Sequence, residues 1–409
     1  MSDLAPRRGA PASFVLLMGA MAALPAIATD MYLPSLPEVA RELDTTATLV
    51  QATITGVLIG GAIGQLLIGP LSDRFGRRPP VLIGLAIHVL MSVLCAMAAG
   101  IAPLIALRVL QGVGNASAMT TAMAVVRDRY TGATAAGILS RLMLVIGVAP
   151  LLAPAAGSFI AQHSSWRGVF VALALLGVAL WVVVWRYLPE TRPPAPASTP
   201  RGASTLRTYG RLLRDRSFIT LAVLPALIMS VLISYIVASP FVFRGQFGMA
   251  PTEFSLFFAL NGIALVLGSQ ANAALVRRVA PLQVMRVALP ASLALAAGLF
   301  LVTLRDNPRL VEVAIPLWLL IGVNALTPPN ATALALSRHG ERAASAAALI
   351  GAMQAAVAGL VSPLVGVVGT GANGMAIVVL GLVTTAALVF VGGVGAYRRG
   401  HDQGADGAQ

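Results

Sequence analysis

The stretch that decides the fold is Gly69-Pro70-Leu71-Ser72-Asp73-Arg74-Phe75-Gly76-Arg77-Arg78-Pro79, a short charged loop between two long apolar runs. The apolar runs cover about 47–71 and about 80–99, and a membrane-spanning helix needs about 20 such residues. Gly76 permits a tight reversal, and arginines suit the anionic headgroups of a membrane surface. The stretch therefore predicts a hairpin of two membrane helices, although taken alone it would also fit an ordinary basic loop.

Ten further apolar runs extend this hairpin in both directions along the chain. They lie at about 13–36, 102–126, 138–162, 168–188, 217–243, 252–275, 283–304, 311–336, 346–368 and 375–396. We expect the first run to be a retained helix and not a cleaved signal peptide. The runs predict an all-α membrane protein of twelve helices in two six-helix halves, residues 1–188 and 217–409, the latter with a short polar tail. A linker rich in Pro, Ser, Thr and Arg, 189–216, joins them as a flexible spacer followed by a basic membrane-surface segment, or as a plain solvated connection.

The composition supports lipid as the main solvent of this chain. Of its 409 residues, 57% are hydrophobic and 11% are charged, with a mean hydropathy of +0.85. About 25% charged residues is usual in soluble domains. A soluble fold is therefore excluded.

The basic residues indicate the orientation in the membrane. All 28 are arginines, and 22 of them fall on one side if the N-terminus is cytoplasmic. Arg41, Arg167, Arg244, Arg305 and Arg309 fall on the other side, and Arg108 lies within a span. This bias is the positive-inside rule, so we expect both termini to be cytoplasmic. The net charge of +13 then reflects topology, and we expect no nucleic-acid partner.

Candidate metal ligands are few and scattered. Cys95 is the single cysteine, and the four histidines (His88, His163, His339 and His401) lie in different segments. We therefore expect no metal site, no cofactor and no enzymatic activity.

Two charged residues lie inside predicted spans at similar depth. Asp30 and Arg108 are each about six residues from the same predicted membrane face, so an ion pair between them is geometrically possible. A polar stripe of Gln111, Gly112, Gly114 and Asn115 follows Arg108. A membrane carboxylate beside an arginine can take up and release a proton. Snorkelling of Arg108 to the membrane surface, and an interfacial or capping Asp30, are the alternatives.

The fifth predicted span carries small residues and two prolines. It contains Gly147, Pro150, Pro154 and Gly157, which bend the helix and allow another helix to approach closely. Generic helix packing would use the same residues.

Together these motifs resemble those of the major facilitator superfamily, and within it the drug:proton antiporters of the bicyclomycin and chloramphenicol resistance (Bcr/CflA) subfamily. The Asp30-Met31-Tyr32-Leu33-Pro34 run, the quoted loop, Val126-Arg127-Asp128, Ala238-Ser239-Pro240-Phe241 and Pro329-Asn330-Ala331 carry the resemblance, whereas Ala149 stands where a glycine is usual. The resemblance implies proton coupling at Asp30 and Arg108 and an antiporter motif at Gly147, Pro150, Pro154 and Gly157. It also implies a cytoplasmic gate at Gly69, Asp73, Arg74, Gly76, Arg77, Arg78, Arg127 and Asp128.

The resemblance further implies a monomer in a bacterial inner membrane that uses the proton-motive force, with no other cofactor, to expel small amphipathic drugs. Phenicols, bicyclomycin or sulfonamides would be such drugs. A polyspecific pocket is mostly apolar and aromatic with a few polar groups. The substrate-binding candidates are Tyr32, Gln111, Asn115, Tyr235, Phe241, Phe258, Asn261 and Gln354. Export of a sugar or amino-acid derivative is the alternative function, and a membrane enzyme or non-transporting receptor is a third possibility.

Overall fold

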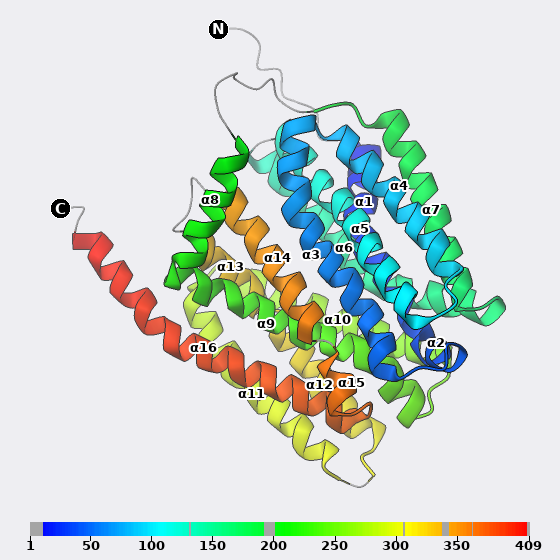
Figure 1. Cartoon of the computed structure of the whole chain (residues 1–409). Coiled ribbons are helices and arrows are strands. Elements are labelled where there is room, and N and C mark those ends of the chain that lie inside the picture. The colour runs from blue at the N-terminus through cyan, green and yellow to red at the C-terminus, as the bar shows by residue number, and fades with distance from the viewer. Residues whose placement is uncertain are drawn as a thin grey trace.

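The computed structural model describes residues 11–130, 132–191, 201–305, 307–337, 343–361 and 363–406, and this part of the chain is helical with no strand. Twelve helices within it are long and apolar enough to cross a membrane. The predicted all-α fold with twelve spans in two six-helix halves is confirmed. Figure 1 shows the first half at the upper right and the second half at the lower left.

Six spans belong to the first half and six to the second. Those of the first half are α1 (Ala12–Asp30) continued by η1 (Leu33–Ser35) and α2 (Leu36–Glu42), α3 (Ala47–Phe75), α4 (Arg78–Ala96), α5 (Ile101–Arg129), α6 (Gly132–His163) and α7 (Trp166–Tyr187). Those of the second half are α9 (Arg216–Ser239) with η2 (Pro240–Gln246), α10 (Pro251–Leu275), α11 (Pro281–Thr303), α12 (Leu310–Asn324) with α13 (Thr327–Ser337), α14 (Ala343–Val361) with α15 (Leu364–Val368), and α16 (Ala372–Asp406).

Local sequence signals explain where several of these helices begin. Helices α10 and α11 start at Pro251 and Pro281, since a proline in the first turn loses no helical hydrogen bond. Helix α9 is capped by Asp215, whose carboxylate accepts hydrogen bonds from the backbone N–H groups of Ser217 and Phe218. The starts of these three helices are therefore set by residues at the helix ends themselves.

The first span is shorter as a regular helix than the apolar run predicted. We expected it to continue to about Leu36, but α1 ends at Asp30. The physical reason is Pro34, because a proline ring clashes with the carbonyl of the residue four positions earlier, here Asp30. The chain then turns through η1 into the short helix α2.

Glycines set the closest helix contacts within the first half. A Cβ atom on Gly60 would lie 1.9 Å from the Val109 carbonyl oxygen, and one on Gly112 would lie 2.1 Å from that of Val57. Helices α3 and α5 therefore touch backbone to backbone, a contact that only glycine allows.

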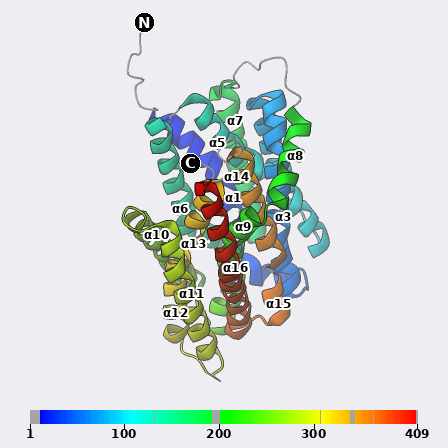
Figure 2. The same cartoon turned by 90° about the vertical axis from the view of Figure 1, so that its left-hand side faces the viewer.

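The two halves meet through α3 against α14 and through α6 against α10. We call the end of the bundle that carries the 72–78 loop and the linker the linker end, and the end that carries α2 and η2 the far end. A view turned by 90° shows α11 and α12 at the lower part of the second half, and α11 packs against α16 (Figure 2).

The buried apolar residues divide differently at the two ends. One cluster runs through both halves and includes Leu36, Val242 and Phe254 near the far end. At the linker end each half has a separate cluster, represented by Leu85 in the first half and Ile350 in the second. The halves therefore share one core toward the far end and have two cores toward the linker end.

The linker contains a helix, α8 (Arg201–Arg214), which packs on α9 and α14. Leu212 is buried against the second half, whereas Arg207, Arg211 and Arg214 are exposed. Residues 192–200 of the predicted spacer lie outside the described residues. The domain limits at 188 and 217 stay predictions.

Candidate functional site

Arg108 is completely buried in the first half, so it does not snorkel to the membrane surface. Its Nη1 donates to the Gln111 side-chain oxygen at 2.6 Å and to the Ala28 carbonyl at 3.2 Å. The guanidinium carbon lies 5.0 Å from the ring centre of Tyr32 and 5.5 Å from that of Phe170. Aromatic faces and hydrogen bonds thus surround the charge, while Nε and Nη2 have no hydrogen-bond partner among the described residues.

The suggested ion pair between Asp30 and Arg108 is absent from the described part of the chain, which corrects the sequence interpretation. Both residues are buried, with Asp30 only 5% exposed. Residues two apart on a helix point about 200° apart, so the position whose carbonyl meets Arg108, Ala28, lies on another side of α1. Equal depth in the membrane was therefore not enough to bring the two charges together.

Asp30 lies within electrostatic reach of the Tyr235 hydroxyl on α9 of the second half, and no hydrogen bond joins the two groups in the described part of the chain. The Tyr235 ring stacks on Phe258 of α10, with ring centres 5.9 Å apart. Three predicted residues, Asp30, Tyr235 and Phe258, thus gather where the halves meet.

Polar atoms without partners mark this central region. Within the described residues, the Tyr235 hydroxyl and the Asn261 side-chain oxygen are buried and have no hydrogen-bond partner. The Asn261 amide nitrogen donates to the Phe257 carbonyl at 2.9 Å, which fixes the orientation of its side chain. A buried polar group without a hydrogen-bond partner costs free energy, so two such groups are expected where a ligand supplies the missing partners.

Gln111 and Asn115 are bonded within the first half. The Gln111 amide donates to the Ser92 hydroxyl at 2.7 Å, and Asn115 shares a 2.6 Å hydrogen bond with Nδ1 of His88. Ser92 and His88 lie on α4. Both predicted substrate residues therefore tie α5 to α4, and their role in substrate binding stays a prediction.

His88 is a residue that the sequence argument overlooked. Its ring is completely buried, and its Nε2 donates to the Leu173 carbonyl on α7 at 3.1 Å. It thereby joins α4, α5 and α7 beside the Arg108 network. The sequence does contain a signal for it, because an ionisable residue in the middle of an apolar run indicates a buried polar role and not only a metal ligand.

The remaining substrate candidates take different positions. Tyr32 is completely buried, with its hydroxyl accepting a 3.4 Å bond from Thr53. Phe241 is half-buried in η2, and Gln354 is half-buried on α14. Phe241 packs against the apolar cluster that contains Tyr235 and Phe258.

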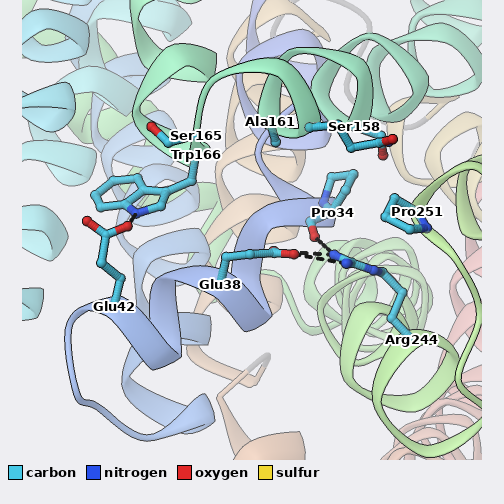
Figure 3. A pocket seen from close by; sticks show the side chains of 10 residues that line it. Pro34, Glu38, Glu42, Ser158, Ala161, Ser165, Trp166, Arg244 and Pro251 are labelled. Atoms are coloured by element: carbon cyan, nitrogen blue, oxygen red, sulfur yellow. Dashed lines mark hydrogen bonds and ion pairs between the residues drawn. The ribbon is translucent and has the colours of Figure 1, made fainter.

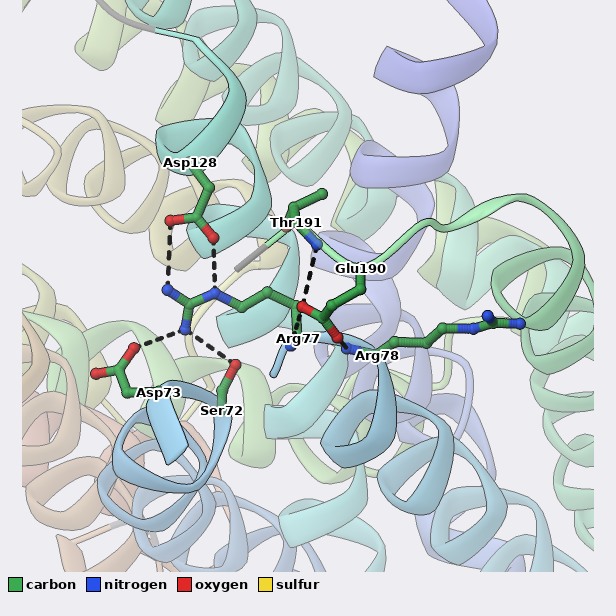
Figure 4. A network of polar contacts seen from close by, with 7 residues as sticks. All are labelled: Ser72, Asp73, Arg77, Arg78, Asp128, Glu190 and Thr191. Carbon is green, nitrogen blue, oxygen red and sulfur yellow. Dashed lines mark hydrogen bonds and ion pairs between the residues drawn. The ribbon is translucent and has the colours of Figure 1, made fainter. Parts of the chain in front are cut away.

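Three of the predicted gate residues, Asp73, Arg77 and Asp128, form an ion-pair network at the linker end (Figure 4). Arg77 donates from Nε to Asp128 at 2.7 Å, and from Nη1 to Asp73 at 2.7 Å and to Ser72 at 3.1 Å. Burial lowers the pKa of Arg77, but the bonds to Asp128 and Asp73 outweigh it, so the pKa is raised overall. The network connects α3 to α5 inside the first half, and the described residues form no ion pair from it to the second half.

Glu190 is a second residue that the sequence argument missed. Its two carboxylate oxygens accept the backbone N–H groups of Arg77 at 2.8 Å and Arg78 at 3.1 Å, at the positive end of α4. It occupies the space over Gly76, where a Cβ atom would lie 2.5 Å from Glu190 Oε2. Gly76 also has a φ of +93°, a backbone conformation that favours glycine.

Of the other gate positions, Arg74 and Arg127 are exposed, and Gly69 and Arg78 are half-buried. Arg74 packs over Phe75, and the guanidinium of Arg78 donates to the Trp185 carbonyl.

Arg127 and Gly69 line a cavity of about 420 Å³ at the linker end. Helices α3 and α5 form one wall of this cavity, α14 supplies Ser345, Ala348 and Gly351, and Tyr209 of α8 completes it. Burial and the Asp73 charge both raise the pKa of Tyr209. Both halves and the linker thus border this cavity.

The antiporter motif lies on α6, the helix that meets α10. A Cβ on Gly157 would lie 1.9 Å from the Met31 carbonyl oxygen, so this glycine sets the contact with the end of the first span. The Pro154 carbonyl accepts a 3.5 Å bond from Ser255 of α10. A Cβ on Gly147 would meet nothing within 4 Å, and Pro150 is half-buried. The motif therefore divides into a packed part, Pro154 and Gly157, and an open part.

No group of three or more His, Cys, Asp or Glu side chains in the described residues is placed to hold a metal ion.

Comparisons with known proteins agree with this architecture. The family model of the Major Facilitator Superfamily matches residues 18–363. The "Uncharacterized MFS-type transporter YdgK" of Bacillus subtilis is 33% identical, over 93% of this chain and 95% of that protein. The "Bicyclomycin resistance protein homolog" of Haemophilus influenzae is 29% identical, over 86% and 88%. The crystal structure of a D-xylose-proton symporter superposes with a TM-score of 0.74 at 17% identity, covering 93% of this chain and 97% of the other.

Proposed function

We propose, from the premise that this chain belongs to the Major Facilitator Superfamily, that it is a proton-coupled multidrug efflux antiporter of a bacterial inner membrane. It expels small amphipathic drugs of the phenicol, bicyclomycin or sulfonamide type by alternating access. Membership of this family supports a membrane transporter of small molecules over a membrane enzyme. The relative named for bicyclomycin resistance agrees with the subfamily that the sequence motifs resemble.

The observation that carries the proposal is the position of Asp30. A carboxylate in the apolar part of a membrane protein is expensive to keep charged, so its proton occupancy depends on its access to water. Asp30 is 5% exposed and lies at the interface that must open and close during alternating access. Protonation and deprotonation at this position would therefore couple proton movement to the change of access. Arg108 supports this segment by donating to the carbonyl of Ala28, two residues before Asp30.

The central cluster suggests the kind of substrate. The Tyr235 hydroxyl offers a hydrogen-bond donor, the Asn261 oxygen offers an acceptor, and Phe258 offers a ring face. Apart from Asp30 these groups are uncharged. They suit an uncharged or zwitterionic amphipathic drug with an aromatic ring, better than a doubly charged cation.

The orientation follows the arginine distribution. We place the linker end in the cytoplasm, with both termini on that side and the Asp73–Arg78 loop, Arg127 and Asp128 as the cytoplasmic gate. The protein acts as a monomer, driven by the proton-motive force, with no nucleic-acid partner.

The test is uphill drug transport in proteoliposomes with an imposed pH gradient. The unchanged protein should accumulate a phenicol against its gradient, and Asp30→Asn should lose accumulation while still allowing downhill flux. Glu253→Gln, at an exposed acid that caps α10, is the matched control and should behave like the parent. Full accumulation by Asp30→Asn would refute the assigned role. Movement of a sugar or amino-acid derivative, but of no phenicol, bicyclomycin or sulfonamide, would favour the metabolite exporter.

A further inference from the structure

Arg244 crosses from the second half to the first at the far end. It lies in η2, the continuation of α9, and its Nη2 is 2.9 Å and its Nη1 3.3 Å from the two carboxylate oxygens of Glu38 on α2. Its Nη1 also donates to the Pro34 carbonyl. Figure 3 shows the guanidinium pointing toward both partners. Such a two-point Arg–carboxylate contact is both strong and directional.

This ion pair differs from every other in the described part of the chain. The pairs of Arg77, Arg167 and Arg305 each lie within one half, whereas Arg244–Glu38 joins the two halves. The Arg244 side chain is 16% exposed and that of Glu38 34%. The pair is therefore shielded enough to be strong, yet near enough to water to be broken without burying a lone charge.

The surroundings hold the Glu38 side of this contact in place. One turn after Glu38 on α2, Glu42 accepts a 2.5 Å bond from the Trp166 indole and pairs with Arg167, both on α7. Helix α2 is thereby anchored to its own half through one acid and to the opposite half through the other. A cavity of about 200 Å³, lined by residues of both halves, lies beside the contact.

The contact is connected directly to the central cluster on both sides. In the first half, Asp30, Pro34 and Glu38 follow one another at intervals of four residues. In the second half, Tyr235 and Arg244 lie on one continuous run, α9 followed by η2. Short helical segments therefore join the Asp30–Tyr235 region to the Arg244 contact in both halves.

We propose that Arg244 is a positioning residue that latches the far end shut. It ties η2 to the Pro34 carbonyl and Glu38, and its release allows the far end to open. A second contact between the halves lies on the neighbouring helices, where the Ser158 hydroxyl of α6 is 2.8 Å from the Ser255 hydroxyl of α10. Ser255 is 6% exposed, so it becomes fully reachable from the far end when this interface parts.

The experiment measures how fast a cysteine at this interface reacts. Ser255→Cys is introduced into the otherwise unchanged chain, whose own Cys95 is buried, and a membrane-impermeant maleimide is added from the far-end side. We expect slow labelling in this parent. Arg244→Gln and Glu38→Gln should each raise the rate about tenfold, the effect of losing a hydrogen bond between charged groups. Arg244→Lys should fall between, because lysine keeps the charge and loses the two-point geometry.

Two matched controls separate a latch from a general loss of charge. Arg305→Gln breaks an ion pair at the same end inside the second half, and Arg167→Gln breaks one inside the first half. Arg305→Gln should leave the labelling rate unchanged. Arg167→Gln should raise it less than Arg244→Gln does. Equal labelling in Arg244→Gln and the parent, or an equal rise in Arg305→Gln, would overturn the proposal.

A charge exchange covers the case in which Arg244→Gln does not fold. Arg244→Glu combined with Glu38→Arg restores the pair in reverse and should return the labelling rate toward that of the parent, whereas Arg244→Glu alone should label fast. Fast labelling in the double variant would contradict the latch. The readout needs neither drug nor pH gradient, so its outcome is independent of the test of drug transport.

Discussion

Arg108 shows what a single residue can reveal from sequence. An arginine within an apolar span is costly enough that a buried functional role was the leading interpretation, and its complete burial confirms that it is not a surface residue. The identity of its partners was not predictable. The Ala28 carbonyl, Gln111, Tyr32 and Phe170 converge on it from three helices, and Asp30 does not.

The shape of the Arg108 site leads to a prediction for Arg108→Lys. A lysine keeps the positive charge but lacks the planar guanidinium that lies against Tyr32 and Phe170. We expect uphill drug transport to fall at least about tenfold, since hydrogen bonds to a charged group contribute about 1.5–3 kcal/mol. Proteoliposome flux, at equal protein amount judged by size-exclusion chromatography, measures this. Parent-level transport by Arg108→Lys would show that charge alone suffices.

His88 leads to a prediction about stability. His88→Leu leaves the Asn115 side chain and the Leu173 carbonyl without their partner in a buried site. An unsatisfied buried polar group costs about 1–3 kcal/mol, so the thermal midpoint in detergent should fall by several degrees. His163→Leu is the control, because His163 is exposed and bonds only to its own helix. A similar midpoint for the two variants would contradict a structural role for His88.

At the scale of helices, the apolar runs and their punctuation predicted most of the elements. Most predicted spans agree with the observed helices to within a few residues, but α6 begins at Gly132 and not at about 138, and α16 runs to Asp406 and not to about 396. The failure at α1 has a local cause that the hydropathy pattern hides. Pro34 is apolar and prolongs the run, but its ring ends the helix at Asp30.

The contact between α3 and α5 gives a sharp prediction at this scale. In Gly60→Ala the added methyl group would lie 1.9 Å from the Val109 carbonyl, whereas next to it, at Gly61, a methyl group meets nothing within 4 Å. Gly60→Ala should lower the free energy of unfolding by about 1–3 kcal/mol through forced separation of the helices. Gly61→Ala should be neutral or stabilising by up to about 1 kcal/mol, since alanine favours helix. Thermal unfolding of the two variants compares them directly, and equal loss in both would refute backbone-to-backbone packing.

At the scale of the whole molecule, the two ends differ in how the halves meet. Toward the far end the halves share an apolar cluster and the Arg244 contact, and at the linker end each half has its own cluster with a cavity of about 420 Å³ between them. If the linker end is cytoplasmic, this arrangement is closed to the outside and accessible from the inside.

The orientation can be tested by labelling single cysteines from either side of the membrane. Gly210 on α8 and Asn307 beyond α11 are exposed positions at opposite ends, and a side chain at 210 meets nothing within 4 Å. A membrane-impermeant maleimide should label Gly210→Cys only in inside-out vesicles and Asn307→Cys only in intact cells. The unmodified chain is the control, since its Cys95 is buried. The reverse pattern would invert the topology inferred from the arginines.

The sequence alone determined the class of fold, the number of spans and the residues worth examining, because these follow from local properties. Helix length, hydropathy and proline placement act over a few neighbouring residues, and the cost of a charge in lipid depends on the residue itself. Only the tertiary structure decided the partners. Asp30 lies near Tyr235 and not near Arg108, Glu190 reaches back across the chain to cap α4, and Arg244 ties the second half to Pro34 and Glu38. Contacts of this kind depend on how each helix is rotated about its axis and how the helices cross. Hydropathy is an average over a whole span, so it does not specify that rotation.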